Sequence, residues 1–417
     1  MKSINNTIQT LRKSKDAQRI LANFSYLSIL QISSYALPML TYPYLAKTIG
    51  VAGFGNIALA MSICAYLMTL TDWGYNFTAT RDIARNRDHI DSVSEIYSVV
   101  MTSKLCLLLI SAICLTCIVI AVSYLRNNFI LYLFAFSTVI GHTIFPEWLY
   151  QGLENMKLIT ILNLFSKILG TILIFVFVRN SNDYIYQPLF SGFGYILAGC
   201  ISIIYAHKKL KINFHFCNLS EVQKSIKKSF DVFINNLMPN LYSNISVIIL
   251  GFYNGNMATG ILDGANKLYT VCAQFLTVLS RVFFPLLSRR IEKHKIFVKI
   301  KLVVTIVFVI ILFFGADILI NTFLSQSFNE SILLLRIFSI SLFFHSLTNI
   351  YGTNYLIIIG EAKLLRKITM MVSLLSFSIA FPFIYYYSYI GAACTMALAR
   401  IILGLSVYYI AKKRIKL

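Results

Sequence analysis

Long apolar runs, each about as long as one crossing of a lipid bilayer, recur along the whole of this 417-residue chain. A transmembrane helix needs about 20 mostly apolar residues, so this length has room for about twelve crossings. Hydrophobic residues make up 58% of the chain and charged residues only 13%. Soluble domains are about 25% charged, and a soluble fold here would lack the polar surface to cover its core. We therefore predict an all-α polytopic membrane protein.

The apolar runs divide into two sets of six. The predicted spans are residues 21–46, 53–72, 99–123, 130–150, 158–178, 185–206, 232–252, 258–287, 302–321, 332–358, 368–386 and 391–411. We predict an N-terminal six-helix lobe over residues 1–206, a cytoplasmic linker over 207–231 and a C-terminal six-helix lobe over 232–417. Every external loop is predicted to be short.

The positive charges support this count. Alternate segments hold most of the 37 Lys and Arg residues, including Lys208 to Lys228 and Arg289 to Lys301. The segments on the other side hold Lys47, Arg126 and Arg179. Cytoplasmic loops carry an excess of Lys and Arg. We therefore predict a multi-pass protein of a bacterial inner membrane with both termini in the cytoplasm.

Glycines repeat at a fixed offset between the two sets of helices. Gly50 and Gly55 follow the first span, and Gly255 and Gly260 stand 205 residues later, after the seventh. An internal repeat of this kind predicts two pseudo-symmetric lobes, related by an axis along the membrane normal, around a central cavity.

Charged residues inside the spans point to what fills that cavity. The embedded cations are Lys104, Lys167, Lys267, Arg281, Arg336 and Arg400. A charge at the bilayer centre costs roughly 2.5–3.5 kcal/mol on insertion scales, so these side chains must face protein or water. Their excess over embedded carboxylates predicts a cationic cavity, which favours an anionic substrate.

The eighth span carries the clearest polar stripe. Its members lie three or four residues apart, which places them on one face of a helix. They are Asp263, Lys267, Thr270, Gln274, Thr277 and Arg281. We predict that this face lines the cavity; the alternative is that Asp263 and Lys267 only neutralise each other as an i,i+4 pair.

Other spans add weaker candidates. Asn240 and Lys167 lie within polar stripes that serve either a cavity or helix packing. Arg81 lies in the predicted cytoplasmic segment after the second span, and Asp72 lies at the end of that span. The histidines at 142 and 345 are predicted to be packing residues.

Several motifs identify a family resemblance. They are Leu37–Leu45 (LPMLTYPYL), Gly53–Gly55 (GFG), Trp73–Asn76 (WGYN), Thr78–Ala84 (TATRDIA) and Pro146–Gly152 (PEWLYQG). With these motifs in this order, the whole chain resembles the O-antigen flippases, the polysaccharide-transporter branch of the multidrug/oligosaccharidyl-lipid/polysaccharide exporter superfamily.

The resemblance implies translocation of undecaprenyl-diphosphate-linked O-antigen units from the cytoplasmic to the periplasmic leaflet by alternating access of two lobes. It implies cationic substrate-binding residues in the lumen, a role open to Lys267, Arg281 and Lys167, with Arg81 at the inner mouth. Gln274 and Asn240 are the neutral substrate-binding candidates. The resemblance also suggests Asp72 and Asp263 as candidates for ion coupling. An O-antigen polymerase and a chain-length regulator are candidate partners.

Three other functions are weighed against this one. A flippase for another lipid-linked polysaccharide precursor fits the same pattern. A drug/cation antiporter would need an acidic lumen, and an O-antigen polymerase would need a long catalytic loop, which this chain lacks. The net charge of +21 is spread over many cytoplasmic segments, so it does not indicate nucleic-acid binding. No nucleotide-binding loop or zinc spacing is visible, so we expect no enzyme activity, no cofactor and no metal.

Overall fold

The computed structural model describes residues 15–238 and 240–414, and all of the regular elements in these ranges are helices. The first half of the chain forms α2 (Lys15–Asp72), α3 (Tyr75–Asn86), α4 (Ile90–Ala121), α5 (Ser123–Arg126), α6 (Phe129–Ile144), α7 (Glu147–Gly152), α8 (Met156–Phe177), η1 (Ser181–Ile185) and α9 (Tyr186–Leu210). The second half forms α10 (Leu219–Leu237), α11 (Asn240–Arg289), η2 (Ile291–Lys293), α12 (His294–Phe314), α13 (Ala316–Phe323), η3 (Gln326–Phe328), α14 (Ser331–Leu347), the π-helix η4 (Thr348–Leu356) and α15 (Ala362–Arg414).

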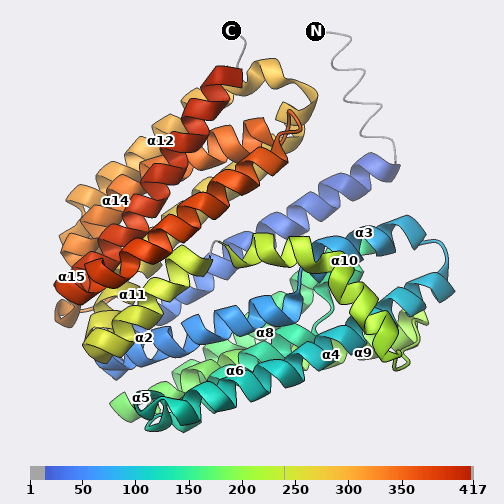
Figure 1. The fold of residues 1–417 in the computed structure, drawn as a ribbon, viewed down its shortest axis with the longest axis horizontal. Coiled ribbons are helices and arrows are strands. Elements are labelled where there is room, and N and C mark those ends of the chain that lie inside the picture. The colour runs from blue at the N-terminus through green and yellow to red at the C-terminus, as the bar shows by residue number, and fades with distance from the viewer. Residues whose placement is uncertain (1–14, 239, 415–417) are drawn as a thin grey trace.

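The three longest helices are each interrupted by one residue with non-helical backbone angles. These residues are Gly50 in α2 (φ 66°, ψ −175°), Gly255 in α11 (φ 80°, ψ −174°) and Ser388 in α15 (φ 50°, ψ −132°). At each of them the helix turns back on itself (Figure 1). Within the described ranges, nine segments are long and apolar enough to span a membrane, three of them containing these turns. This pattern is compatible with the predicted twelve crossings.

Gly50 and Gly255 confirm the repeat that the sequence predicts. They adopt nearly the same left-handed φ and the same extended ψ although they lie 205 residues apart. A positive φ of this kind is accessible to glycine and costly for residues with a Cβ atom. The two halves therefore turn at equivalent positions by the same backbone geometry.

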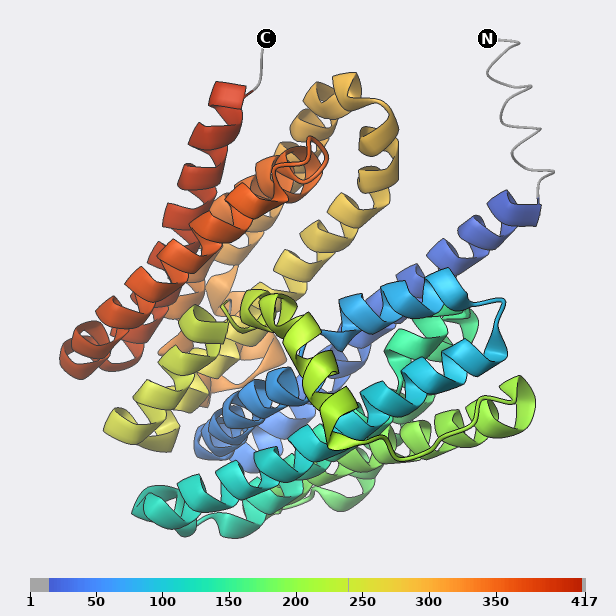
Figure 2. The ribbon, with the colours of Figure 1, turned by 45° about the vertical axis from the view of Figure 1, so that its right-hand side comes forward.

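The helices assemble into two lobes. One contains α2, α4, α6, α8 and α9, and the other contains α11, α12, α14 and α15; α2 and α11 pack against each other at the interface between the lobes. The lobes lie close together where α2 and α11 turn back, and they diverge toward the end where α2 begins and α15 ends (Figures 1 and 2). With the termini cytoplasmic, as predicted, the closed end is external.

Two close backbone contacts join the lobes at the closed end. A Cβ atom on Gly55 would lie 1.7 Å from the carbonyl oxygen of Asn256, and one on Gly260 would lie 2.0 Å from that of Val51. Gly55 and Gly260 are repeat equivalents, and so are Val51 and Asn256, each pair 205 residues apart. A two-fold axis produces such reciprocal pairs. We call these two pairs the glycine contact.

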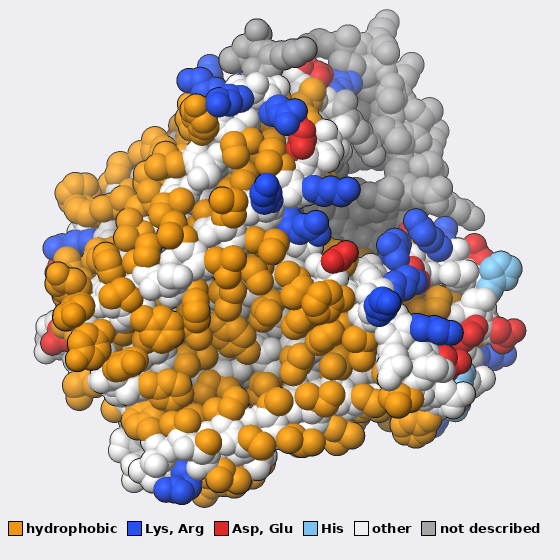
Figure 3. Space-filling view, viewed as in Figure 1, with side chains coloured by type: hydrophobic (Ala, Val, Ile, Leu, Met, Phe, Trp, Pro, Cys, Tyr) orange, Lys and Arg blue, Asp and Glu red, His pale blue; other side chains and the backbone are white. Residues whose placement is uncertain are grey.

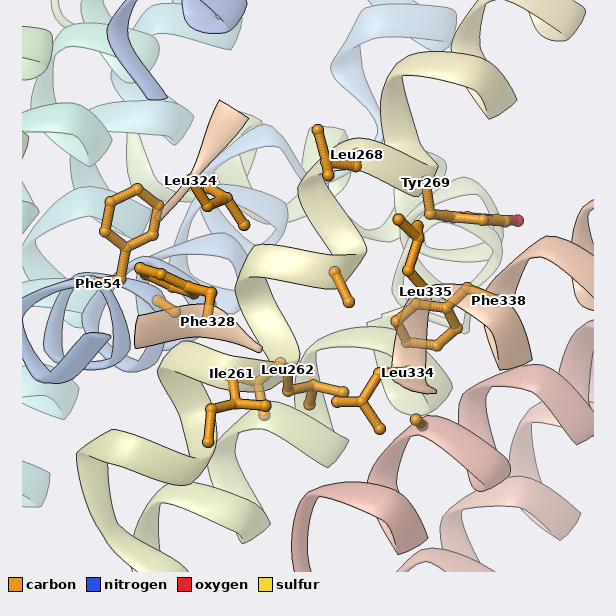
Figure 4. Packing of buried hydrophobic residues seen from close by; sticks show 14 of the residues in the cluster. Phe54, Ile261, Leu262, Leu268, Tyr269, Leu324, Phe328, Leu334, Leu335 and Phe338 are labelled. Carbon is orange, nitrogen blue, oxygen red and sulfur yellow. The ribbon is translucent and has the colours of Figure 1, made fainter. Parts of the chain in front are cut away.

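Apolar packing continues the interface beside this contact. The rings of Phe54 in α2 and Phe328 in η3 meet edge to face with centroids 5.4 Å apart. Figure 4 shows Phe54, Leu324 and Phe328 on one side of α11, and Leu335 and Phe338 on the other. The largest buried cluster of hydrophobic residues therefore includes both lobes.

The outer surface is apolar, as a lipid-facing surface must be. Hydrophobic side chains cover most of the broad face, and Lys and Arg gather toward the end where the described chain begins and ends (Figure 3). Exposed leucine, isoleucine and phenylalanine side chains occur on α4, α8 and α12. Lipid covers such surfaces in a membrane, so they need no protein partner.

From the sequence, Lys301 is assigned to a cytoplasmic segment, and the structure shows that this assignment is wrong. Its side chain is fully buried in α12. Its ammonium donates to the carbonyl oxygen of Leu276 at 3.1 Å and to the hydroxyl of Ser280. Asn354 of the π-helix donates to the carbonyl oxygen of Ser280. Partners on α11, more than 20 residues away in sequence, compensate the buried amine, and a loop-by-loop count of charges does not find them.

The predicted linker, residues 207–231, contains the end of α9 and most of α10, while its boundaries with the lobes stay a prediction. α10 lies on the N-terminal lobe (Figure 2). Trp73 stacks on Phe233 of α10 at 4.1 Å, and its indole N–H donates to the carbonyl oxygen of Ile226 at 2.9 Å. Thr78 and Ser229 share a buried hydrogen bond of 2.8 Å.

This arrangement gives a stability prediction. Trp73→Ala is expected to lower the free energy of unfolding by about 2 kcal/mol, because the half-buried indole loses its stacking and its hydrogen bond. The midpoint of thermal unfolding of the purified protein in detergent measures this effect. Phe216→Ala is the control, since Phe216 is an aromatic residue shortly before α10 whose side chain is 77% exposed. An equal shift in the two variants would contradict the docking of α10 through Trp73.

Candidate substrate cavity

A cavity of about 370 Å³ lies between α2, α8, α9 and α11. Apolar side chains of α2 form one wall. The polar and charged residues that line the cavity are Thr41, Tyr42, Ser166, Lys167, Thr171, Gln187, Ser191, Tyr195 and Lys267. Among the described lining residues, the charged ones are Lys167 and Lys267. The cavity therefore has the cationic character that the sequence predicts.

Lys267 enters this cavity from α11. Its ammonium is 2.6 Å from the Asp263 carboxylate and lies over the rings of Tyr42 (5.1 Å) and Phe54 (5.0 Å). Only 22% of the Lys267 side chain is exposed, compared with 16% of Asp263. Both interpretations of the pair therefore hold together: the two residues form an i,i+4 ion pair, and the lysine faces the cavity. The aromatic rings add cation–π attraction that keeps the ammonium at the cavity wall.

The opposite wall, on α8 and α9, is rich in neutral polar groups. Gln187, Ser191 and Tyr195 follow one another at four-residue steps along α9. Ser166 is 1% exposed. The Ser166 hydroxyl and the Gln187 side-chain carbonyl oxygen are buried with no hydrogen-bond partner in the described structure. Buried polar groups normally have partners, so unpaired ones beside a cavity are available to a polar ligand.

The structure places the other predicted site residues elsewhere. Gln274 is half-buried and Arg281 is exposed farther along α11, and neither lines this cavity. Asn240 joins the lobes instead: its side-chain amide donates to the Thr69 hydroxyl at 2.8 Å, and its backbone carbonyl oxygen accepts from the Tyr66 hydroxyl. The roles of all three in substrate binding stay predictions.

Arg81 lies on α3, away from the cavity. Its side chain is 49% exposed and forms an ion pair with the neighbouring Asp82 at 3.1 Å. The same carboxylate pairs with Lys228 of α10 at 2.5 Å. Arg81 is therefore accessible from the predicted cytoplasmic side, and its role at the inner mouth stays a prediction.

The two candidate ion-coupling carboxylates both have cationic partners. Asp263 pairs with Lys267, as described above. Asp72, at the end of α2, pairs with Lys104 of α4 at 3.0 Å and lies 3.6 Å from Nδ1 of His142 on α6. Lys104 is 1% exposed, so Asp72 compensates a cation that would otherwise be isolated in the lobe interior.

Sequence reasoning missed the α9 wall. The i,i+4 spacing of Gln187, Ser191 and Tyr195 is visible in the sequence. It has no charged member, and neutral polar stripes are common at helix–helix contacts. The structure separates the two cases because it places these residues beside Lys167 and Lys267.

Comparison with known proteins agrees with this architecture. Residues 20–291, more than half of the chain, match the family model described as polysaccharide biosynthesis protein. The chain belongs to this family. Within the family, it is 30% identical to a candidate O-antigen transporter of Escherichia coli (strain K12) over 90% of this chain and 92% of the relative. It is 26% identical to a candidate O-antigen transporter of Shigella dysenteriae, over 92% of this chain and 98% of the relative. The resemblance found in the sequence is thereby confirmed.

Solved structures show how this family member folds. An inward-facing multidrug resistance MATE family transporter of the MOP superfamily aligns with a TM-score of 0.65 and 16% identity, over 92% of this chain and 98% of that chain. The lipid II flippase MurJ, in an inward closed conformation, aligns with a TM-score of 0.58 and 17% identity, over 87% and 85%. The chain therefore shares its fold with these two transporters.

Most of the motifs that carry the family resemblance pack in the protein core and do not line the cavity. Tyr75, Trp148 and Tyr150 are buried together in the core of the N-terminal lobe. The Tyr150 hydroxyl donates to the carbonyl oxygen of Ser202 on α9 at 2.5 Å. The LPMLTYPYL and GFG motifs are the exceptions, because they supply Tyr42 and Phe54 to the cavity wall.

Proposed function

We propose that this protein is a flippase that moves undecaprenyl-diphosphate-linked O-antigen repeat units from the cytoplasmic to the periplasmic leaflet by alternating access. The observation that carries the proposal is a cavity in the N-terminal lobe, faced by Lys267 of α11, whose charged lining residues are Lys167 and Lys267. A diphosphate is a compact polyanion, and lysine binds phosphate as a point charge. Family membership supports the same class of substrate.

The neutral wall suits the other part of this substrate. Sugar hydroxyl groups both donate and accept hydrogen bonds, as do the side chains of Gln187, Ser191 and Tyr195. The unpaired oxygens of Ser166 and Gln187 supply acceptors. The lipid tail needs no polar wall, because it can stay in the bilayer. The three parts of a lipid-linked oligosaccharide thus each have a suitable environment.

The proposal includes a location and a mode of action. The protein acts as a transporter and not as an enzyme, in a bacterial inner membrane with both termini cytoplasmic. Asp72 and Asp263 are the proposed ion-coupling carboxylates, and Arg81 lies at the proposed inner mouth. An O-antigen polymerase and a chain-length regulator are its proposed partners. A drug/cation antiporter is disfavoured, since an organic cation would meet two lysines in the cavity.

Complementation of a strain that lacks its own O-antigen flippase tests the proposal. Expression of the wild-type chain is expected to restore surface O-antigen and to clear lipid-linked units from the cytoplasmic leaflet. An empty vector at matched growth is the control. If membrane expression is normal and a strain with matched sugars is not rescued, the O-antigen proposal fails. Rescue of a strain that exports a different lipid-linked polysaccharide would then identify the other precursor class.

A further inference from the structure

We propose that His142 is a proton-binding site that links proton uptake to occupation of the substrate cavity. This inference rests on the proposed function, because it assumes an anionic substrate at Lys167. It differs from the packing role that the sequence predicts for this histidine, and it adds a proton acceptor to the two proposed coupling carboxylates.

A continuous run of ionisable side chains crosses the N-terminal lobe, and His142 stands in its middle. On one side, Nδ1 of His142 lies 3.6 Å from Oδ1 of Asp72, and the same oxygen is 3.0 Å from the ammonium of Lys104. The side chain of Asp72 is 15% exposed and that of Lys104 is 1% exposed. Water therefore screens the charges of Asp72 and Lys104 only weakly, while the His142 side chain is 36% exposed and so can exchange a proton with water.

On its other side, the run reaches the cavity through Glu147. This carboxylate, at the start of α7, accepts a hydrogen bond of 2.7 Å from the Asn163 side chain. It also interacts electrostatically with His142, with Lys167 and with Tyr195. Lys167 and Tyr195 line the cavity. Glu147 thus acts on both the half-buried imidazole and the cavity wall, and the ring of Tyr195, which lines the cavity, lies 6.3 Å from that of His142.

The charges along the run balance without the histidine. Lys104 and Lys167 are cations, and Asp72 and Glu147 are anions, so a neutral imidazole leaves the run without net charge. An imidazole titrates at about pH 6.5 in water, closer to neutrality than a carboxyl or an amine. His142 is therefore the member of this run best suited to gain and lose a proton.

The C-terminal lobe provides an internal comparison. It also contains a half-buried histidine, His345, whose ring bonds to the side-chain amide of Asn349 at 3.2 Å. The charged groups that act on His345 are the cations Arg400 and Lys301. A positive imidazole at 345 would be repelled by both of them, whereas at 142 it would face two carboxylates. The two histidines thus lie in opposite electrostatic environments, which makes His345 a matched control.

Within the described part of the chain, the charged and titratable neighbours of His142 come from four helices. They are Asp72 on α2, Lys104 on α4, Glu147 on α7 and Tyr195 on α9, whose ring centroid is 6.3 Å from that of His142. A phosphate bound at Lys167 competes with Glu147 for that ammonium. Glu147 is then less compensated and attracts a proton to His142 more strongly. Because linkage is reciprocal, protonation of His142 also favours phosphate binding at Lys167.

Proton uptake on ligand binding tests this linkage. Farnesyl diphosphate is titrated calorimetrically into the purified full-length protein at pH 7, in two buffers with different ionisation heats. The wild type is expected to take up protons on binding. His142→Gln is expected to bind the probe while losing at least half of that uptake, and His345→Gln is expected to match the wild type. The probe's own protonation is common to all three proteins and cancels in the comparison.

Two further checks keep the inference open to disproof. Glu147→Gln, which keeps the shape of the side chain, is expected to lose the same uptake, so the result does not depend on one variant that could misfold. Gel filtration and thermal unfolding report on folding. Equal uptake in wild type and His142→Gln would overturn the inference and leave the proposed function intact. Failure of the wild type to bind the diphosphate probe would overturn the proposed function, and the inference with it.

Discussion

Lys267→Ala is expected to lower the rate of lipid-linked oligosaccharide transport by more than tenfold. The substitution removes a cation from the cavity wall and leaves the carboxylate of Asp263, 2.6 Å from the original ammonium, without its partner. The diphosphate then loses the attraction of the lysine and is also repelled by an uncompensated carboxylate in a partly buried site. A tenfold loss corresponds to about 1.4 kcal/mol. Transport into proteoliposomes, at equal amounts of reconstituted protein, measures it.

Two comparisons separate the loss of attraction from the added repulsion. The double variant Lys267→Ala, Asp263→Ala removes both charges, so we expect it to recover part of the lost rate. Arg281→Ala changes an exposed cation on the same helix that does not line this cavity, and we expect a loss of less than about threefold, as for a weakly coupled surface charge. Equal rates for Lys267→Ala and Arg281→Ala would contradict the assignment of the cavity.

Gly55→Ala and Gly260→Ala are each expected to reduce transport at least tenfold by preventing closure of the external end. A methyl group at either position would overlap a carbonyl oxygen of the opposite lobe, at 1.7 Å from Asn256 and 2.0 Å from Val51. Backbone cannot move aside as the end of a side chain can, so the lobes must separate. The reciprocal geometry predicts similar losses for the two variants.

Accessibility to a membrane-impermeant thiol reagent distinguishes lobe separation from misfolding. The reporter is Met61→Cys, at a lining position of the cavity, in a chain whose eight native cysteines are replaced by serine. External labelling is expected to rise at least fivefold in both glycine variants. Gly352→Ala is the control, because its methyl group would meet side-chain ends rather than backbone, at 3.1 Å from Leu365 and 3.4 Å from Val407. Unchanged labelling alongside lost transport would contradict the role of the glycine contact.

The sequence predicts the broad architecture well because a membrane imposes it. Every crossing must be a long apolar helix, so hydropathy locates the spans, and the distribution of Lys and Arg predicts their orientation. The offset between Gly50 and Gly255 is also readable, since a turn with positive φ favours glycine in both halves. The turns inside α2 and α11 occur at these two glycines.

Side-chain partners are less predictable, because packing decides them. Lys104 and Asp72 lie 32 residues apart in sequence and on different helices, and no spacing rule connects them. Lys267 could be placed because its stripe contains charges at helical steps. Gln274 and Arg281 share that stripe, yet the cavity does not extend along the helix to reach them. The length of a cavity depends on how two lobes meet, which a helical pattern does not contain.

The reciprocal glycine pairs bear on the ancestry of the chain. Tandem duplication of a six-helix ancestor that formed a symmetric dimer would give one subunit contact, repeated by the two-fold axis, and Gly55–Asn256 and Gly260–Val51 are its two copies. At the same 205-residue offset from His142 the C-terminal half carries Leu347, so this histidine is confined to one half and records divergence after fusion. In a homodimer every substitution appears in both subunits. After fusion, one half of the chain can change on its own, while both halves keep the glycine contact.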